Sequence, residues 1–539
     1  MTHEHEVAMK VNPQKWVESL KYSFTNKTTV LSELMQNARR AGASAVRFNY
    51  TTDSPTDSNN LVVSDDGCGI ESMATLLSVA ESGWNTELVN QEHPFGIGFL
   101  SALFACRHLL VTSNGKEISA NTQDVLAFKT IPVTPCEWNG TTDIVLTGME
   151  LDEQTILNTL RILARGFPIP VYFNGECLER PAAEDSDYLV FIDTEIGKVY
   201  LHGLVKPSLR NSSYEVYLQG LPIYRTPSFY SDRHHVIHLN SSCFDARLPD
   251  RDKLIDEEGA IGRITEVLRQ AIEKRLRSMK MTLSAEEFAM FYQIMCDWQL
   301  LHLLNDVPIV PWQVLQEIVS YPVCSCQYGD FSEYPRKPVT RDEIEARGIA
   351  TIDDVIEQDG AGRYLFAWKK GYLVYDKRYL DSGHWLHDLI DDLQTKELRI
   401  EPFNGTDRYV FEGDWTSLDV RFCDCYRIHL DDDVIEIHDD AVYLGSDNDC
   451  EAIIPKQDAS GFVLKQVGRY ENEYDDFQKA LHEADVEALS RFCIANTTIE
   501  PSDALASLLP DFSGCPLLYG KSFRIRLDPT GKVVKVEAA

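Results

Sequence analysis

The order of three short motifs constrains the fold of this chain more than any other feature of its sequence. The first is Glu33-Leu-Met-Gln-Asn37-Ala38, within a stretch from Asn26 to Ala43 whose apolar residues recur at helical spacing. Residues four apart share one face of a helix, and this face is otherwise apolar. The pattern therefore predicts that Glu33 and Asn37 point toward a shared interior, although an exposed Glu33 and a surface Asn37 also fit the motif taken alone.

The second motif, from Val63 to Ile70, is a predicted strand that runs into an acidic turn. Gly67 and Gly69 permit positive φ and a close approach of the backbone to a ligand. Asp65 places a carboxylate at the end of a buried strand, where it is a directional acceptor suited to an exocyclic amine such as that of adenine. Taken alone, D-x-G-x-G is equally typical of an ordinary acidic turn.

The third motif is His93-Pro-Phe-Gly96-Ile97-Gly98-Phe99, directly before a predicted helix. Unpaired backbone N–H groups at the start of a helix favour phosphate, and glycines allow it to approach closely. The motif is not a Walker A loop because no G-K-[ST] follows it. It is not a dinucleotide-binding turn either, since no strand leads directly into it.

Together the three motifs resemble the signature of the GHKL superfamily, which includes gyrase, heat-shock chaperone, histidine kinase and MutL ATPases with the Bergerat nucleotide-binding fold. Val79-Ala-Glu-Ser82-Gly83 is similar to the stretch that opens the nucleotide lid in HtpG-type chaperones, and Gly140-Thr-Thr142 to the strand whose Thr closes the adenine pocket. The segment from Phe244 to Leu254 resembles the chaperone middle-domain segment in which an Arg reaches the γ-phosphate. The resemblance covers roughly residues 15–283 and is greatest to the HtpG-type branch.

This resemblance implies a role for each matching residue. Glu33 would orient and deprotonate the attacking water, and Asn37 would ligate Mg²⁺ through its carbonyl oxygen. Asp65 would receive the adenine amine, and Arg251 would offset charge that develops during phosphoryl transfer. A surface Arg that caps a helix is the alternative for Arg251. The other residues expected to contact ATP are Gly67, Gly69, Ser82, Gly96, Ile97, Gly98, Phe99 and Thr142.

The chain also departs from the superfamily pattern. Arg39 and Arg40 precede Ala41 where many relatives carry an Asp before the Ala. Glu81 stands in place of the lid lysine, and His93 in place of the first glycine of the loop. These departures bear on lid geometry and phosphate affinity, and they leave the carboxylate and carboxamide core intact.

Length and composition predict an α+β protein of several domains. At about 100–200 residues per domain, 539 residues correspond to three or four domains. We expect a GHKL ATP-binding domain, a Bergerat-type α/β sandwich, at 1–180 and an α/β transducer-like domain at 181–283. A mixed helical region with a hairpin at 364–375 is expected at 284–400, and an acidic β-rich region at 401–539.

Acidic residues are concentrated in the C-terminal half. The formal net charge is −33, of which the 24 basic and 48 acidic residues from Ser284 to Ala539 account for −24 and the first 283 residues for −9. No Lys or Arg occurs between Met281 and Pro335. Because binding to nucleic acid needs clustered Lys and Arg, this distribution argues against a polyanion-binding face there.

Thirteen cysteines, an odd number, fit reduced thiols better than a disulfide framework. Two close pairs occur, Cys324/Cys326 and Cys423/Cys425, and the second pair is expected on one face of a single strand at 421–430. Zinc sites usually space their thiolates C-x₂₋₄-C, so the C-x-C spacing favours ordinary core thiols and leaves metal binding open.

We expect an ATP-binding, slowly ATP-hydrolysing, chaperone-like clamp that acts on a protein partner through its acidic C-terminal half, in a form that can include an ATP-dependent homodimer. The alternatives are a DNA-acting GHKL ATPase of the MutL, topoisomerase or chromatin-ATPase type, and a phage- or defence-related nucleotide switch with an acidic interaction module. The N-terminus lacks the apolar core of a signal peptide, and no run of about 18 apolar residues occurs, so a cytoplasmic protein without a membrane anchor is expected.

Overall fold

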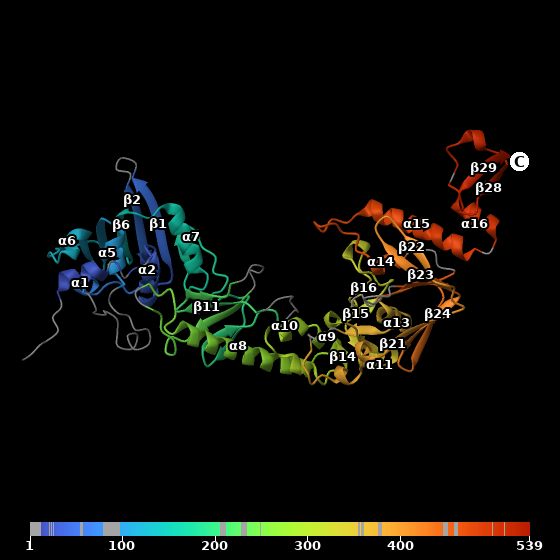
Figure 1. The fold of residues 1–539 in the computed structure, drawn as a ribbon. Coiled ribbons are helices and arrows are strands. Elements are labelled where there is room, and N and C mark those ends of the chain that lie inside the picture. Colours follow the sequence, from blue (N-terminus) through green and yellow to red (C-terminus); the bar gives the residue numbers. More distant parts are fainter. Residues whose placement is uncertain are drawn as a thin grey trace, which may run out of the picture. The chain divides into compact units, whose positions relative to one another are not determined.

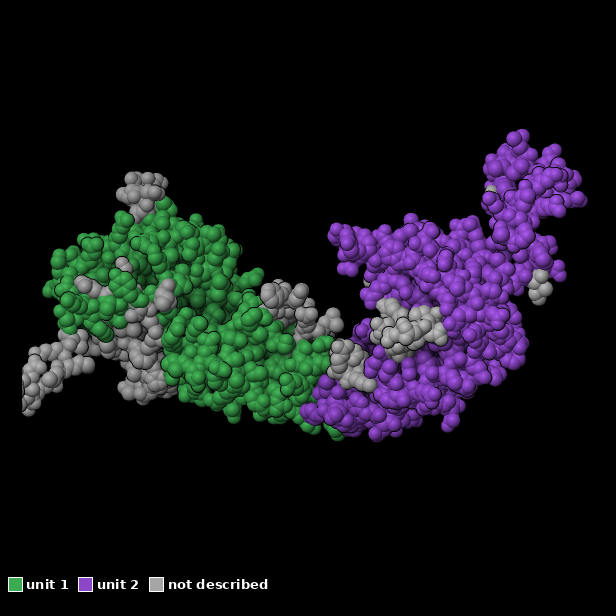
Figure 2. All heavy atoms as spheres, viewed as in Figure 1, with its two compact units in different colours: residues 1–300 green, residues 301–539 purple. Residues whose placement is uncertain are grey.

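The computed structural model divides the chain into two compact units, Met1–Leu300 and Leu301–Ala539 (Figure 2). Each unit combines helices with β-sheets, which confirms the expected α+β class. The finer boundaries at 180, 283 and 400 stay predictions. The structure describes residues 12–20, 22, 24, 26–53, 58–78, 98–204, 212–227, 234–247, 250–353, 356, 361–375, 380–445, 451–456, 462–498, 500–510 and 512–539.

An eight-stranded sheet forms the centre of the N-terminal part, in the order β5-β4-β3-β6-β2-β1-β7-β8 (Figure 1). Neighbouring strands are antiparallel except β1 and β7, which are parallel. The strands are β1 (Val46–Asp53), β2 (Ser58–Asp65), β3 (His108–Ser113), β4 (Lys116–Asn121), β5 (Val133–Pro135), β6 (Thr142–Met149), β7 (Val171–Phe173) and β8 (Glu176–Cys177). The helices are α1 (Pro13–Leu20), α2 (Thr29–Arg40), α3 (Met73–Leu76), α5 (Leu100–Ala105), α6 (Thr122–Leu126) and α7 (Glu153–Ala164).

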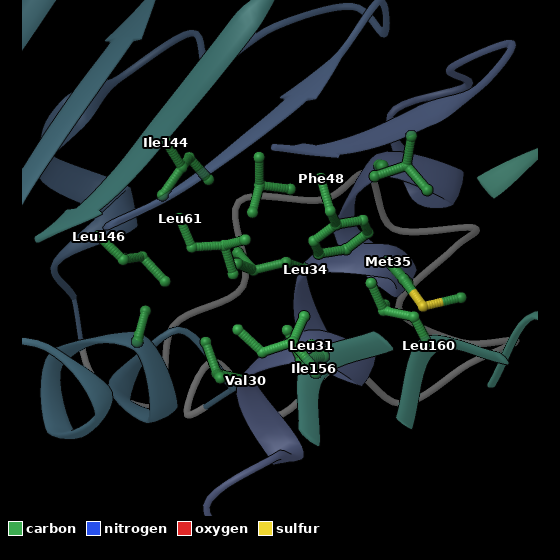
Figure 3. Packing of buried hydrophobic residues seen from close by; sticks show 14 of the residues in the cluster. Val30, Leu31, Leu34, Met35, Phe48, Leu61, Ile144, Leu146, Ile156 and Leu160 are labelled. Carbon is green, nitrogen blue, oxygen red and sulfur yellow. The ribbon is translucent and has the colours of Figure 1, made fainter. Parts of the chain in front are cut away.

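One hydrophobic core joins α2, α5 and α7 to this sheet. In α2 the buried apolar residues recur at helical spacing, whereas in β1 and β2 they alternate, so each element presents one apolar face to the others. Figure 3 shows the result: Leu34 of α2 lies beside Phe48 and Leu61 of the strands, and Leu31 beside Ile156 of α7. This packing fixes the orientation of α2, the helix that carries Glu33.

A second sheet follows in the same unit, in the order β12-β11-β13-β10-β9. β11 and β12 are joined by the two-residue turn Gln219-Gly220, in which both residues have positive φ (53° and 80°), as a tight hairpin turn requires. The elements are β9 (Phe191–Thr194), β10 (Gly197–Tyr200), β11 (Tyr214–Leu218), β12 (Leu221–Arg225), β13 (His235–Leu239), α8 (Glu257–Lys280), α9 (Ala285–Ala289) and α10 (Tyr292–Asp297).

The second unit contains five separate sheets among its described residues. Its strands are β14 (Ile309–Val310), β15 (Leu315–Ile318), β16 (Ser332–Glu333), β17 (Val339–Thr340), β18 (Ile349–Thr351), β19 (Leu373–Tyr375), β20 (Ile390–Asp392), β21 (Leu398–Phe403), β22 (Tyr409–Glu412), β23 (Ser417–Cys423), β24 (Cys425–Leu430), β25 (Asp433–Ile437), β26 (Val442–Leu444), β27 (Glu451–Pro455), β28 (Phe523–Leu527) and β29 (Val533–Ala538). Its helices are α11 (Arg341–Arg347), α13 (Gly362–Lys370), α14 (Leu464–Val467), α15 (Lys479–Thr497) and α16 (Pro501–Leu508), with 3₁₀ turns η1 (Leu301–Leu304), η2 (Trp312–Val314), η3 (Cys326–Tyr328), η4 (Trp385–Asp388), η5 (Leu393–Thr395) and η6 (Pro516–Leu518).

Two predictions for this unit were wrong. Residues 364–375 form helix α13 followed by strand β19, because Gly371 adopts a left-handed conformation (φ 74°) that ends the helix instead of forming a hairpin turn. The predicted single strand at 421–430 is two strands, since the chain leaves β23 at Cys423 and enters β24, in another sheet, at Cys425. The two cysteines therefore do not share one face of a strand.

The helix predicted after the third motif is short in the described residues, where α5 covers Leu100–Ala105 and β3 begins at His108. Among all described helices, none combines the length and apolar character needed to cross a membrane.

Candidate functional site

Glu33 lies on the buried side of α2, and Asn37 follows one helical turn later and is partly exposed. Gly98, two residues before the start of α5, approaches the Glu33 carboxylate so closely that an added Cβ would overlap Glu33 Oε2. A side chain at position 98 is thus incompatible with the observed position of Glu33. The first and third motifs therefore meet at the Glu33 carboxylate.

The second motif packs against the end of the same helix. A Cβ added at Gly67 would lie 2.6 Å from Ala41 Cβ, and the Cys68 N–H donates to Ala41 O at 2.8 Å. Within the turn, the Gly67 N–H donates to Asp65 Oδ1 at 3.0 Å. Because the glycine turn is docked on the C-terminus of α2, the Asp65 carboxylate is held near the helix that carries Glu33 and Asn37.

Asp65 and Thr142 are opposite each other in the antiparallel pair β2–β6. The buried Thr142 hydroxyl lies 2.8 Å from that of Ser113, and Ser113 Oγ accepts from the Ile70 N–H at 2.9 Å. A carboxylate and two hydroxyl groups thus come together at one end of three adjacent strands. Sequence reasoning identified Asp65 and Thr142 as site residues and missed Ser113.

Gly69 has a positive φ of 75°, and a Cβ there would lie within 3 Å of the Asn114 side chain. The Asn114 amide also donates to Cys68 O at 3.4 Å. Asn114 and Gly115 form the turn between β3 and β4, a pair typical of tight hairpins. Because an Asn-Gly pair indicates a hairpin turn, the sequence Asn114-Gly115 could have indicated that Ser113 and Asn114 lie at the end of a strand.

The two neighbouring carboxylates of the second motif differ in their environments. Burial raises the pKa of Asp65 above its usual value, although the Gly67 N–H opposes this and the charges of Asp66 and Asp143 add to it. The pKa of Asp66 is lowered, chiefly by the hydrogen bond from the Ser44 hydroxyl. Asp66 also accepts from the Ser44 N–H at 2.7 Å, so it ties the turn to the segment after α2, while Asp65 is the carboxylate left at the end of the strand.

Arg251, in the segment before α8, reaches the Glu33 carboxylate. Its Nε lies 3.3 Å from Glu33 Oε1, and the two side chains are 12% and 7% exposed. Asp250, the preceding residue, accepts from the Thr29 hydroxyl at the start of α2 at 2.6 Å. Arg251 is therefore not a surface residue that caps a helix, because its side chain is largely buried and paired with Glu33.

The hairpin tip at Gln219 forms a further contact with α2. Gln36 donates to Gln219 O at 2.9 Å, while the guanidinium groups of Arg40 and Arg251 both lie 3.4 Å from Gln219 Oε1. Arg40, one of the residues that depart from the superfamily pattern, thus contacts the hairpin turn. Asp250 lies within the segment 244–254, in which sequence reasoning assigned a role to Arg251 alone, and no pattern pointed to Gln219.

Several predicted site residues lie outside the described residues, namely Ser82, Gly96 and Ile97, as do Glu81 and His93. Phe99 is described and packs against the main core. The functional roles of all these residues, and of Glu33, Asn37, Asp65, Gly67, Gly69, Gly98, Thr142 and Arg251, stay predictions.

Residues 22–133 match the family described as "Histidine kinase-, DNA gyrase B-, and HSP90-like ATPase". This match supports the GHKL superfamily. The matched segment contains Glu33, Asp65 and Gly98, and it ends before Thr142 and Arg251. A GHKL-type domain implies ATP binding at the general level and does not single out the HtpG-type branch. No curated protein matches the chain.

Proposed function

We propose that this protein binds ATP with Mg²⁺ at the site around Glu33 and Asp65 and hydrolyses it slowly. The observation that carries the proposal is the position of Glu33, a buried carboxylate that contacts the glycine before α5 and pairs with Arg251. A general base needs such a placement, within reach of a water and beside the groups that would hold the phosphates.

The described residues fit the adenine end of ATP. The buried hydroxyls of Ser113 and Thr142 and the carboxylate of Asp65 supply acceptors and donors for the base and for a bridging water. Gly67 and Gly69 let the turn pack closely beside this end, because a Cβ at either would collide with Ala41 or Asn114.

At the phosphate end, Gly98 would offer its backbone N–H, and Arg251 would offset negative charge that develops on the phosphoryl group. Asn37 would hold Mg²⁺ through its carbonyl oxygen, and the ion would neutralise part of the phosphate charge. Glu33 would accept the proton of the attacking water. Three of these residues are adjacent, since Glu33 pairs with Arg251 and lies against Gly98.

We further propose that nucleotide state is transmitted from α2 to the second sheet, as in a chaperone-like clamp of the HtpG type. The contacts that support this are Thr29–Asp250, Glu33–Arg251 and Gln36–Gln219, which connect one helix to two separate segments. The acidic C-terminal half, with a net charge of −24, is the surface on which a protein partner of opposite charge would act. Sedimentation of the full chain with and without a non-hydrolysable ATP analogue separates a closing dimer, which gains mass, from a monomeric switch, which does not.

The hydrolysis experiment compares wild type with Glu33→Ala and with Glu258→Ala, an exposed glutamate of α8 that serves as control. We expect Mg²⁺-dependent hydrolysis on the order of turnovers per minute in wild type and the control, and none in Glu33→Ala, which still binds ATP. Wild-type hydrolysis by Glu33→Ala would refute the assignment. Stimulation by DNA at low salt would instead favour the DNA-acting alternative, which the net charge of −33 argues against.

A further inference from the structure

A cysteine, a glutamate and a histidine lie together at one end of the strand pair β24–β25, with the histidine directly after β25. Cys425 Sγ, a carboxylate oxygen of Glu436 and a ring nitrogen of His438 are all within 4.8 Å of one another. In the antiparallel pair β24–β25, Arg427 is opposite Glu436, and residues two apart on a strand share a face. The register therefore brings all three side chains to the same place.

The neighbouring Arg427 orients the carboxylate of this group. Its Nε donates to Glu436 Oε2 at 2.9 Å, while Glu436 Oε1 lies 3.0 Å from His438 Nε2. One oxygen is thus held by the guanidinium and the other faces the histidine. Hydrogen bonds of this kind, from residues that do not touch the metal, commonly orient metal ligands.

We propose that Cys425, Glu436 and His438 bind Zn²⁺. A thiolate, an imidazole and a carboxylate are donors that zinc takes, whereas Mg²⁺ and Ca²⁺ prefer oxygen ligands alone. Zinc–sulfur bonds of about 2.3 Å and zinc–nitrogen bonds of about 2.0 Å require donors closer together than 4.8 Å. Glu436 and His438 are 38% and 61% exposed, so their side chains have room to close on the ion, while Cys425 is only 7% exposed and anchors the site.

Three protein donors leave the fourth tetrahedral position to water, as in zinc sites with an exchangeable ligand. The donor set differs from the Cys423/Cys425 pair considered from the sequence. Cys423 is fully buried at the end of β23, in another sheet, and its Sγ lies 3.9 Å from Ile454 O. The inference is independent of ATP binding, since all three residues lie in the second unit.

Zinc content of the purified full chain tests the site, measured by elemental mass spectrometry after equilibration with ZnCl₂ and gel filtration. We expect about one zinc per chain in wild type and a loss of most of it in Cys425→Ser and in His438→Ala. The matched controls are Cys515→Ser, an exposed cysteine, and His429→Ala, a histidine of β24 that lies 3.2 Å from Glu401. Both controls should retain the metal.

Two outcomes would overturn the proposal: wild type without zinc above the level of a metal-free blank, or His438→Ala with the wild-type zinc content. Because Cys425 is buried, its substitution can disturb folding. The zinc content of the His438→Ala variant, at an exposed residue, is therefore the deciding measurement. Titration with Co²⁺ adds a direct readout, since a thiolate-to-cobalt charge-transfer band should appear in wild type and in His429→Ala. Absence of that band in wild type would count against the thiolate ligand.

Discussion

Arg251 Nε lies 3.3 Å from Glu33 Oε1, and both side chains are largely buried. The pair joins the helix of the first motif to the segment before α8. If Glu33 serves as the base and Arg251 contacts the γ-phosphate, the ion pair links the two functions, because Arg251 in its observed position neutralises the carboxylate. ATP would compete with Glu33 for Arg251.

The first prediction concerns the stability of this pair. Arg251→Ala leaves the buried Glu33 carboxylate without its cation, and we expect a loss of about 2–4 kcal/mol in the free energy of unfolding. Adding Glu33→Gln to that variant removes the unpaired charge and should restore part of the loss. Urea denaturation of the four proteins in the cycle measures the coupling. Strictly additive effects would mean that the observed contact contributes nothing to stability.

The second prediction concerns Gly98. Gly98→Ala introduces a Cβ that overlaps Glu33 Oε2, so the carboxylate must shift and ATP hydrolysis should fall by at least about ten-fold, as small displacements of catalytic groups do. Gly262→Ala is the matched control, because a Cβ at this position of α8 meets nothing within 4 Å and the change favours helix. Equal hydrolysis rates in the two variants would show that Glu33 does not act from its observed position.

The third prediction is a pH dependence of ATP affinity. In the proposed site the adenine amine donates to an ionised Asp65, and burial raises the pKa of this carboxyl. As the pH falls, Asp65 should take up its proton at a higher pH than an ordinary aspartate does. The affinity for ATP should therefore already be falling before the pH reaches 3.8. Fluorescence titration with a labelled ATP analogue over the acid range measures this. An affinity that stays constant until the protein unfolds would contradict it.

The raised pKa also has a consequence for stability. The native state binds the Asp65 proton more tightly than the unfolded state does, so this group reduces stability as the pH rises through the interval between the two pKa values. Asp65→Asn removes that cost, and its melting temperature at neutral pH should equal or exceed that of wild type. A lower melting temperature would indicate that the Asp65 carboxylate stabilises the turn.

The fourth prediction concerns His384 in the second unit. Its side chain is 2% exposed and accepts from the Leu386 N–H at 3.1 Å, and burial, together with the charge of His387, lowers its pKa to about 4. A histidine with a lowered native pKa takes up its proton more readily when unfolded, so stability should fall as the pH drops below 6.5. Between pH 7 and pH 5 the expected loss from this group is about 2 kcal/mol.

Urea denaturation at the two pH values checks this in wild type and His384→Asn, whose side-chain oxygen can still accept from the backbone. The variant should lose less stability between them. Identical pH dependence in wild type and His384→Asn would exclude His384 as the source of acid lability.

Local elements of the ATP-binding part were predictable because their apolar patterns match their structure. Helix α2 and strands β1 and β2 bury residues at the spacing that their sequences show. The failures have local physical causes. Gly371 ends a helix where a hairpin turn was predicted. Asp424 separates two strands that belong to different sheets, although the sequence pattern at 421–430 is that of a single strand.

The contacts that assemble the site could not be predicted from any local pattern. Asp65 is opposite Thr142 because β6 pairs with β2 across a long stretch of chain, and strand register of this kind depends on packing of the whole sheet. Likewise, nothing in the residues around Gln219 indicates that its backbone carbonyl accepts from Gln36. The pairing of Glu33 with Arg251 depends on how segments far apart in the chain pack together.

The most direct test of the central claim is isothermal titration of the full chain with MgATP, for wild type, Asp65→Asn and Asp66→Asn. Asp66→Asn is the control, because its carboxamide keeps an oxygen for the Ser44 N–H. We predict one ATP per chain in wild type and Asp66→Asn, and an affinity about ten- to a hundred-fold lower in Asp65→Asn, which loses a hydrogen bond to a charged group. Wild type that binds no ATP, or Asp65→Asn that binds it as wild type does, would contradict the account.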